Sequence, residues 1–521
     1  MAKTPRLDDK GYRKFGIRDK LGYMFGDFGN DFTFILSTSI LMKFYTDVMG
    51  VSAGIVGTLM MLARFVDAVT DVTMGRICDA SKRTAAGKFK PWLMRMCVPV
   101  ALASFLMYAP GLGANVTETW PYGVRVAWLI ITYLLWGSFC YTGINIPYGS
   151  MASAISPDAG DRSSLSTFRT MGGTLAGIFI GVGLPLIAYD KITLTDGTTQ
   201  DVLSGSRVAI AAGIFSILAI VCYILCYKLC TERVVADETT EKKKGPSVAA
   251  MIKSAVTNRA LLSIIVASIF MLLAQLTMQN MMSYVYPDYY NAASLQSVGS
   301  MTMMIGMVIA AAIAKPLTSK FGKAEVSAVC SVAGAVICVI MWVIKPSVYV
   351  YMAMSTLFWL FLGVFSMICW ALITDVIDYS ELKNGVREDG SVYAMYSFAR
   401  KLGQALASGL SGWLLTWIGY NENALAQGVA QTESVKSGIF TVSTLVPAAG
   451  FLALAAVLWF WYPLHKKQVD ANIQALKDKH ASTSPISTQE AFTAVAASAD
   501  GDLSPAEISD LKAIDENEKN D

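Results

Sequence analysis

Twelve apolar stretches, each long enough to cross a bilayer as a helix, run through most of this 521-residue chain. A bilayer core of roughly 30 Å needs about 20 apolar residues per helix. The chain is 54% hydrophobic and only 16% charged, below the share that is usual in soluble domains. The sequence therefore predicts an all-α membrane protein. The spans are expected at 22–46, 52–77, 92–110, 125–152, 168–188, 207–230, 259–284, 296–318, 325–344, 349–374, 393–418 and 437–462.

Basic residues gather on one side of the predicted spans. The segment before the first span and the even-numbered loops carry many of them, Lys14 and Lys88 among these. The odd-numbered loops 46–52, 189–205 and 419–436 are poor in Lys and Arg. The positive-inside rule then places both termini in the cytoplasm. We expect a multi-pass protein of a bacterial inner membrane.

One long charged interruption divides the chain into two parts. Residues 231–258 are predicted to be a cytoplasmic loop between a six-helix bundle at 22–230 and a second bundle at 259–463. Two six-helix halves around a central cavity are typical of the major facilitator fold. Residues 1–21 are expected to be a cytoplasmic segment. Residues 464–521, which are polar and poor in aromatic side chains, are expected to be a largely disordered cytoplasmic tail.

Charge and composition argue against several function classes. The net charge of +3 provides no field that favours nucleic acid. The two histidines, His465 and His480, lie outside the predicted spans, and no nucleophile–histidine pattern or metal triad is visible. We therefore expect no enzyme activity and no cofactor. The expected partners are a small-molecule substrate, a monovalent cation and the bilayer, with the chain as a monomer.

Ionisable residues inside the predicted spans are the main functional candidates, because a charge in a bilayer costs several kcal/mol unless it is paired or hydrated. In the first span, Asp27, Asn30 and Asp31 lie at i, i+3 and i+4 and share one helix face. The alternative is a solvated helix end, since Lys20 lies only seven residues before Asp27.

The second span carries a charged stripe. Arg64, Asp67 and Asp71 lie at i, i+3 and i+7, with Thr70 beside them. Two carboxylates one turn apart repel each other when both are ionised, so this face favours a bound proton or cation between them. Carboxylate and hydroxyl oxygens also suit Na⁺. The alternative is a structural Arg–Asp pair between helices.

The fourth span is interrupted in its second half. The stretch Tyr141–Gly149 combines Thr142, Asn145 and Tyr148 with a proline and two glycines. Proline and glycine release backbone groups that need other partners. The pattern is typical of a helix that bends around a cavity, and the alternative is a simple packing kink.

Cations in two further spans complete the candidates. Arg169 opens the fifth span, where it either faces the cavity or caps the helix. Ser397, Arg400 and Lys401 belong to the eleventh span, and the two cations lie about eight residues inside it. A lysine at this depth needs a counter-charge, and the acids of the first two spans are natural partners.

Several motifs together resemble the glycoside–pentoside–hexuronide:cation symporters, the family of melibiose permease. The resemblance runs from about residue 19 to residue 465. The motifs are Gly26-Asp27 with Asn30-Asp31, Phe44-Tyr45-Thr46-Asp47, Arg64-Phe65-Val66-Asp67-Ala68-Val69-Thr70-Asp71, Gly87-Lys88-Phe89-Lys90-Pro91-Trp92, Asn145-Ile146-Pro147-Tyr148-Gly149-Ser150, and Asp378-Tyr379 followed by Arg387 and Arg400-Lys401-Leu402-Gly403-Gln404.

The resemblance implies an alternating-access permease that moves a glycoside together with H⁺, Na⁺ or Li⁺. It implies that Asp67 and Asp71 hold the cation, that Lys401 links the two sites, and that Asp31 and Arg169 bind sugar hydroxyls.

Two positions differ from the sodium-using melibiose branch of that family. Thr70 stands where that branch has Asn, and Asn145 stands where it has Asp. The sugar and the choice between H⁺ and Na⁺ therefore stay open. The remaining alternatives are a lipid or lysolipid carrier of the same fold and a sugar sensor that does not transport.

The predicted site thus has three parts. The cation ligands are Asp67, Asp71, Thr70 and Thr142, and no other metal site is expected. The coupling residues are Lys401 and Arg64. The substrate ligands are Asp27, Asp31, Asn145, Tyr148, Arg169, Ser397 and Arg400.

Overall fold

A computed structural model describes most of the chain, including all the predicted spans. The described residues are 12–113, 116–195, 197–234, 258–384 and 389–483. Arg387 of the resemblance motif lies outside the described residues. So do 1–11 of the predicted N-terminal segment, 235–257 of the predicted central loop and 484–521 of the predicted tail.

The N-terminal half consists of six long helical spans. Short connecting helices are η2 (Ala109–Leu112) and α4 (Val116–Thr119). The spans are α1 (Ile17–Lys43) continued by η1 (Phe44–Val48), α2 (Ala53–Ala80), α3 (Lys90–Tyr108), a fourth span made of α5 (Tyr122–Leu134), η3 (Leu135–Tyr141) and α6 (Thr142–Ile155), α7 (Ala159–Ala188) and α8 (Gly205–Leu229).

The C-terminal half repeats this plan. Its spans are α10 (Arg259–Tyr284) continued by η4 (Val285–Tyr289), α11 (Leu295–Phe321), α12 (Lys323–Ile344), α13 (Val348–Asn384), α14 (Asp389–Trp417), and α16 (Glu433–Ala456) continued by η5 (Val457–Trp461). The short α15 (Ala424–Gln427) precedes α16, and α17 (Lys466–Thr483) follows the last span. Asn258 caps α10, because its side chain accepts hydrogen bonds from the backbone N–H groups of Ala260 and Leu261.

The predicted all-α arrangement of two six-helix halves is confirmed. Within the described residues, ten helices are long and apolar enough to cross a membrane by length and composition. The other two long helices, α1 and α14, carry ionisable residues inside their spans, Asp27 and Asp31 on α1 and Arg400 and Lys401 on α14. The two least apolar spans are therefore those that carry several of the candidate site residues.

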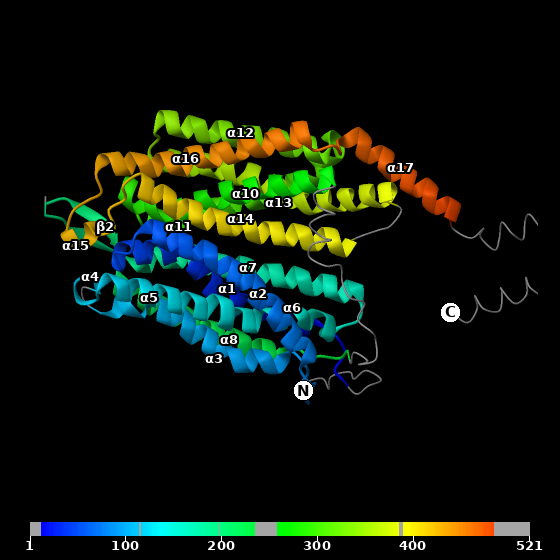
Figure 1. Cartoon of the computed structure of the whole chain (residues 1–521), viewed down its shortest axis with the longest axis horizontal. Coiled ribbons are helices and arrows are strands. Elements are labelled where there is room, and N and C mark those ends of the chain that lie inside the picture. The colour runs from blue at the N-terminus through cyan, green and yellow to red at the C-terminus, as the bar shows by residue number, and fades with distance from the viewer. Residues whose placement is uncertain (1–11, 114–115, 196, 235–257, 385–388, 484–521) are drawn as a thin grey trace, which may run out of the picture.

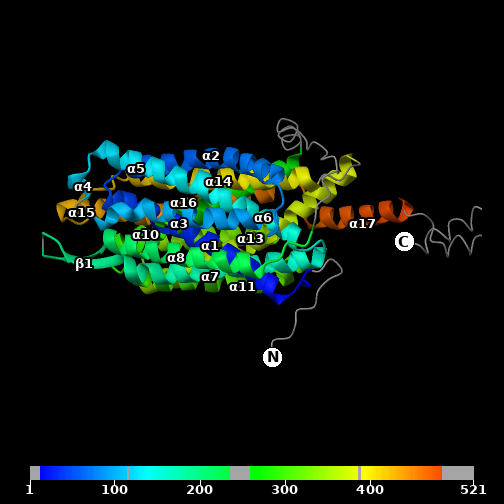
Figure 2. The same cartoon turned by 90° about the horizontal axis from the view of Figure 1, so that it is seen from below.

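The structure adds one feature that the sequence analysis took for a loop. Two strands form a β-hairpin, in which β1 (Tyr189–Thr193) pairs antiparallel with β2 (Thr199–Leu203). Tyr189 lies opposite Leu203 in the register. The hairpin and α15 lie at one end of the molecule, and α17 lies at the other (Figures 1 and 2). The positive-inside rule makes the hairpin end the periplasmic end.

The two halves lie side by side and meet along two helix pairs. The C-terminal half occupies the upper part of Figure 1 and the N-terminal half the lower part. Helix α2 packs against α14, and α7 packs against α11. Gly57 of α2 and Gly412 of α14 make the first contact close, since a Cβ on Gly412 would lie 2.3 Å from the carbonyl oxygen of Ala53. Small residues allow helices in membranes to approach in this way.

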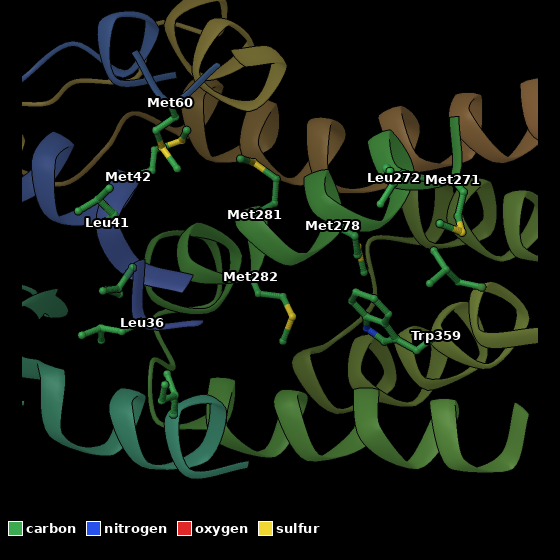
Figure 3. Close-up of a cluster of buried hydrophobic side chains, with 14 of the residues drawn as sticks. Leu36, Leu41, Met42, Met60, Met271, Leu272, Met278, Met281, Met282 and Trp359 are labelled. Carbon is green, nitrogen blue, oxygen red and sulfur yellow. The ribbon is translucent and has the colours of Figure 1, made fainter. Parts of the chain in front are cut away.

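Methionine is prominent in the core where the halves meet. Met42 of α1, Met60 of α2 and Met281 and Met282 of α10 lie in one region of buried side chains (Figure 3). Methionine fills irregular space with a flexible, polarisable side chain. This region borders the cavity described next.

Candidate substrate and cation site

A cavity of about 580 Å³ lies between the two halves. Helices α1, α2 and α7 line it from the N-terminal half, and α10, α11, α13 and α14 line it from the C-terminal half. A volume of this size suits a small organic molecule. Among the described residues that line the cavity, Arg64 is the only one with a charged side chain.

At the candidate cation site, two hydrogen bonds join α2 to the fourth span. Asp67 and Asp71 lie one turn apart on α2, and Ser138 and Thr142 lie one turn apart on the fourth span. The Ser138 hydroxyl donates to Asp67 Oδ1 at 2.6 Å. The Thr142 hydroxyl donates to Asp71 Oδ1 at 2.9 Å. Carboxylate and hydroxyl oxygens thus lie in two neighbouring pairs, and oxygen atoms of this kind can hold H⁺ or a hard cation such as Na⁺.

Each carboxylate also meets a cation through its other oxygen. Arg64 NH1 lies 3.4 Å from Asp67 Oδ2 within the same helix. Lys401 Nζ of α14 lies 2.5 Å from Asp71 Oδ2, so this ion pair joins the two halves. The Lys401 side chain is 45% exposed, whereas that of Arg64 is 16% exposed. Lys401 is therefore the cation that can leave its carboxylate at the lower cost.

Two hydroxyls in this region differ from the sequence interpretation. The Thr70 hydroxyl donates to the backbone oxygens of Val66 and Asp67 and not to a carboxylate. Ser138 was not among the predicted ligands. It lies four residues before Thr142, the same spacing that separates Asp67 from Asp71, and this matched spacing is the signal that identifies it. It belongs to η3, a π-helical segment of a kind often found at functional sites.

A second polar cluster joins α1, α6 and α7. Arg169 Nε donates to Asp27 Oδ1 at 2.9 Å. The Arg169 guanidinium lies over the ring of Tyr148, 5.3 Å from its centre. Tyr148 is buried, and its hydroxyl donates to the backbone oxygen of Tyr23 at 2.7 Å. The Tyr148 ring therefore packs against the Arg169 guanidinium, and Tyr148 is not among the residues that line the cavity.

Asp31 differs from the other acids of the site because its carboxylate makes no direct hydrogen bond or ion pair with the described residues. The described residues make no hydrogen bond or ion pair with it, although it is partly buried. Its Oδ2 atom lies against Gly173 of α7, where a Cβ would be only 2.5 Å away. A partly buried carboxylate that makes no hydrogen bond with the described residues is available to the hydroxyl groups of a ligand.

Asn145 lies in the same cluster. The Asn30 amide donates to Asn145 Oδ1 at 3.5 Å, and the Tyr223 hydroxyl donates to Asn30 Oδ1 at 2.9 Å. The three side chains come from α1, α6 and α8. Asn30 is thereby held between the other two, and the amide nitrogen of Asn145 donates to no acceptor among the described residues.

The structure does not bring Arg400 to this cluster. Its guanidinium packs over the rings of Trp370 and Tyr396 in the C-terminal half. Ser397 lies one turn before Lys401 on α14 and makes no hydrogen bond with the described residues. The remaining predicted residues fall into the two clusters around Asp71 and Asp27.

A third charged cluster, at the periplasmic end, was not predicted. Lys43 Nζ lies 2.7 Å from Asp47 Oδ2 and 2.8 Å from Asp288 Oδ2. The Tyr420 hydroxyl lies 2.8 Å from Asp47 Oδ1 and 3.1 Å from Asp288 Oδ2. Burial raises the pKa of Tyr420, so its phenol stays protonated. We call these four residues the periplasmic lock, since Lys43 and Asp47 belong to one half and Asp288 and Tyr420 to the other.

The β-hairpin strengthens this closure. Asn291, after η4, accepts a hydrogen bond from the Asp201 N–H and donates one to the Thr199 oxygen, both at 2.8 Å. The Thr195 N–H donates to the Gly428 oxygen at 3.0 Å. The hairpin belongs to the N-terminal half, whereas Asn291 and Gly428 belong to the C-terminal half. It therefore straps the two halves together at the periplasmic end.

The sequence matches a family and several curated proteins over nearly its whole length. The family described as MFS/sugar transport protein matches residues 22–466. The symporter YjmB of Bacillus subtilis (strain 168) is 29% identical over 90% of this chain and 96% of its own length. The glucuronide carrier protein homolog of Escherichia coli (strain K12) is 29% identical over 87% and 93%. The putative glycoside/cation symporter YagG of the same strain is 27% identical over 92% and 98%.

Solved structures share the fold. The crystal structure of a D-xylose-proton symporter covers 86% of this chain and 96% of its own with a TM-score of 0.55. The sequence identity is 13%, so this likeness concerns the arrangement of helices alone.

Proposed function

This chain belongs to the MFS/sugar transport protein family, and on that premise we propose that it takes up a glycoside together with H⁺ or Na⁺. The predicted membership of the glycoside–pentoside–hexuronide:cation symporters is confirmed, and so is the major facilitator fold. The chain is a transporter and not an enzyme, and it is a multi-pass protein of a bacterial inner membrane.

The observation that carries the proposal is the ion pair between Asp71 and Lys401. It is the link between the candidate cation site on the N-terminal half and a helix of the C-terminal half. A cation that binds between Asp67 and Asp71 competes with Lys401 for Asp71. Binding of the ion therefore changes a contact between the halves, which is the requirement for coupling ion binding to their movement.

The substrate is proposed to bind beside this pair. Asp31 offers an unpaired acceptor, and Asn145 and Arg169 offer donors, which together suit the hydroxyls of a sugar ring. Linkage then requires that the cation and the sugar increase each other's affinity by the same factor. The two halves rock around the filled site and release both ligands on the cytoplasmic side.

The test is uptake of labelled glycosides into membrane vesicles that contain the full chain. Inward gradients of Na⁺ and of H⁺ are imposed separately. We expect accumulation above the external concentration with one gradient or with both. Equilibration without accumulation under both gradients would contradict coupled transport, and binding without uptake would instead indicate a sensor.

A variant of Asp71 tests whether uptake depends on the candidate cation site. Asp71→Asn is expected to abolish accumulation while exchange of sugar across the membrane persists. The control is Asp190→Asn, which removes a half-exposed ion pair with Arg207 inside the N-terminal half. If Asp71→Asn accumulates sugar to the level of the control, Asp71 is not part of the cation site.

A further inference from the structure

The periplasmic lock holds more acidic than basic groups in a buried place. Lys43 is its basic residue, and Asp47 and Asp288 are both acids. The side chains of these three residues are 1%, 12% and 8% exposed. With both acids ionised, the lock carries one more negative than positive charge. A buried charge without a counter-charge is costly, so this imbalance favours one additional positive charge in the closed lock.

The hydrogen bonds of Tyr420 also need one more hydrogen than the ionised lock provides. The Tyr420 oxygen lies 2.8 Å from Asp47 Oδ1 and 3.1 Å from Asp288 Oδ2. A hydroxyl donates one hydrogen bond, whereas an ionised carboxylate only accepts. Tyr420 therefore donates to one of the two carboxylates, and at the other contact two oxygens meet with no hydrogen between them. A proton on that carboxylate supplies the missing hydrogen.

Tyr420 joins the two acids into one pair that shares a proton. When Asp47 carries the proton, it donates to the Tyr420 oxygen, and the Tyr420 hydroxyl donates to Asp288. When Asp288 carries it, the two hydrogen bonds point the other way. Each arrangement places a hydrogen in both contacts and makes the lock neutral as a whole. Acids that interact so closely titrate as a pair.

No second cation contacts the acids of the lock among the described residues. The charged and titratable groups on the elements around it are Arg125, Tyr189, Lys191, Asp201, Arg207, Tyr284 and Glu422. Arg207 is paired with Asp190. Arg125 donates to backbone oxygens of the turn after η1. Asp201 and Glu422 accept backbone N–H groups and add negative charge. The surroundings therefore do not supply the missing positive charge.

A small cavity gives the lock access to protons of the periplasm. Its volume is about 30 Å³, and Asp47, Asp288 and Tyr420 line it together with residues of the hairpin and of the segment after α14. A polar cavity of this size has room for a water molecule. The hairpin marks the periplasmic end of the molecule (Figures 1 and 2). Water in this cavity can pass a proton between the periplasm and the two acids.

We propose that the periplasmic lock is a proton-dependent gate, which closes with one periplasmic proton shared by Asp47 and Asp288 and opens when that proton leaves. An O–H bond to a carboxylate oxygen forms on closure, and the proton returns to periplasmic water on opening. This proton does not cross the membrane, so it is separate from the coupling ion at Asp67 and Asp71. The proposal goes beyond glycoside transport and does not depend on the identity of the substrate.

The direction of the pH effect follows from the number of bound protons. In the open state the two acids face water, where an aspartic acid loses its proton above about pH 4. The closed pair keeps one proton at higher pH. The closed state is therefore favoured at low periplasmic pH and is lost as the pH rises. Because the closed state binds one proton more than the open state, the ratio of closed to open molecules should fall up to about tenfold per pH unit.

The test follows the distance between two spin labels across the periplasmic end of the purified full chain. The labelled cysteines replace Glu118 of α4 and Ser347 between α12 and α13, two exposed positions on different halves. The nine native cysteines are buried, so the labels attach at the new positions. Distances are measured by electron–electron double resonance from about pH 5 to about pH 9, without sugar and without Na⁺. We expect the closed population to decrease as the pH rises, and equal populations over this range would overturn the proposal.

Four variants locate the proton. Asp47→Asn and Asp288→Asn each remove the excess negative charge and place an amide donor beside Tyr420, so each should make closure independent of pH. Asp190→Asn is the matched control at the same end, where it removes a partly exposed ion pair. Asp71→Asn removes an acid of the candidate cation site. The last two should keep the pH dependence of the wild type. If both lock variants keep it, or if Asp71→Asn loses it, the proton is bound elsewhere and the proposal is wrong.

A variant of Tyr420 tests the shared hydrogen bonds. Tyr420→Phe keeps the ring but removes the oxygen that lies between the two acids. The pH at which half of the molecules are open should fall by about one unit, because the proton loses a hydrogen-bond acceptor. Tyr284→Phe is the control, since its hydroxyl contacts Thr46 and no carboxylate, and it should leave this pH unchanged. An unchanged value in Tyr420→Phe would contradict the proposed place of the proton.

Discussion

Two lysine–aspartate pairs among the described residues connect the halves of this transporter, and the exposed fractions of their side chains differ. The periplasmic pair of Lys43 and Asp288 is almost fully buried, with side chains 1% and 8% exposed. The pair of Lys401 and Asp71 has side chains that are 45% and 21% exposed. The two pairs have similar lengths, 2.8 Å and 2.5 Å.

The difference assigns the two pairs different parts in a transport cycle. A buried pair is costly to break because each charge is left without water. The periplasmic lock therefore favours the state in which that end is closed. An exposed pair contributes little to stability and exchanges its partner easily. Lys401 and Asp71 are accordingly suited to respond to an incoming ion.

The largest effect is expected from removing the charge of the periplasmic lock. Lys43→Met leaves Asp47 and Asp288 without their cation and should lower the free energy of unfolding by about 3–5 kcal/mol. The measurement is thermal unfolding of the purified protein together with uptake into vesicles. The double variant Lys43→Met/Asp288→Asn should recover part of the loss. A Lys43→Met protein as stable as the wild type would show that the lock contributes nothing.

The hydrogen bonds between the β-hairpin and Asn291 should contribute less to closure of the periplasmic end than the periplasmic lock does. Asn291→Gly removes two side-chain hydrogen bonds but tolerates the positive φ of 50° at this position. The closed periplasmic end should lose about 1–2 kcal/mol.

A cysteine at Ser300 reports this change, because Ser300 lines the cavity and all nine native cysteines are buried. Its labelling by a membrane-impermeant reagent from outside the cell should become up to about tenfold faster in Asn291→Gly. Lys191→Ala, an exposed position on the same hairpin, is the control. Equal labelling rates in both proteins would mean that the hairpin does not hold the halves together.

The hydroxyls of the cation site should contribute about one hydrogen bond each. Thr142→Ala or Ser138→Ala should lower the affinity for the coupling ion about fivefold, because each loses about 1 kcal/mol. Thr70→Ala should leave it unchanged, since the Thr70 hydroxyl bonds the backbone of its own helix. The measurement is the ion concentration that gives half-maximal uptake, and an effect of Thr70→Ala equal to that of Thr142→Ala would reverse the assignment.

The smallest effect on stability is expected at the exposed pair. Lys401→Gln should change the free energy of unfolding by about 0–1 kcal/mol, in contrast to Lys43→Met. Uptake driven by an ion gradient should nevertheless be lost, since Asp71 no longer exchanges partners between the ion and the other half. A large loss of stability in Lys401→Gln would show that the two pairs do not differ as proposed.

The sequence predicted the charged faces of single helices well. The spacing of Asp67 and Asp71 and the depth of Lys401 in its span followed from helix geometry alone, and the structure places these residues together. Ser138 was missed because a lone serine in an apolar span is usually a packing residue without a functional role. Its four-residue spacing to Thr142 matches that of Asp67 to Asp71, but the contact with Asp67 is what assigns it to the site.

The periplasmic lock shows why some contacts could not be predicted. Lys43 lies near the end of its span, where a lysine ordinarily reaches the membrane surface. Its partner Asp288 is 245 residues away in the chain, in the other half. Nothing in either local pattern reveals that the two side chains meet in a buried place.

The sequence alone determined the number of spans, their orientation and the helix face that carries each charge, because apolar length, loop charge and helical period are local properties. Only the tertiary structure decided which charges pair across the halves, where the hairpin closes the molecule and which methionines face the cavity. Those features depend on how two separately folded bundles approach each other, and no segment of either bundle encodes that approach by itself.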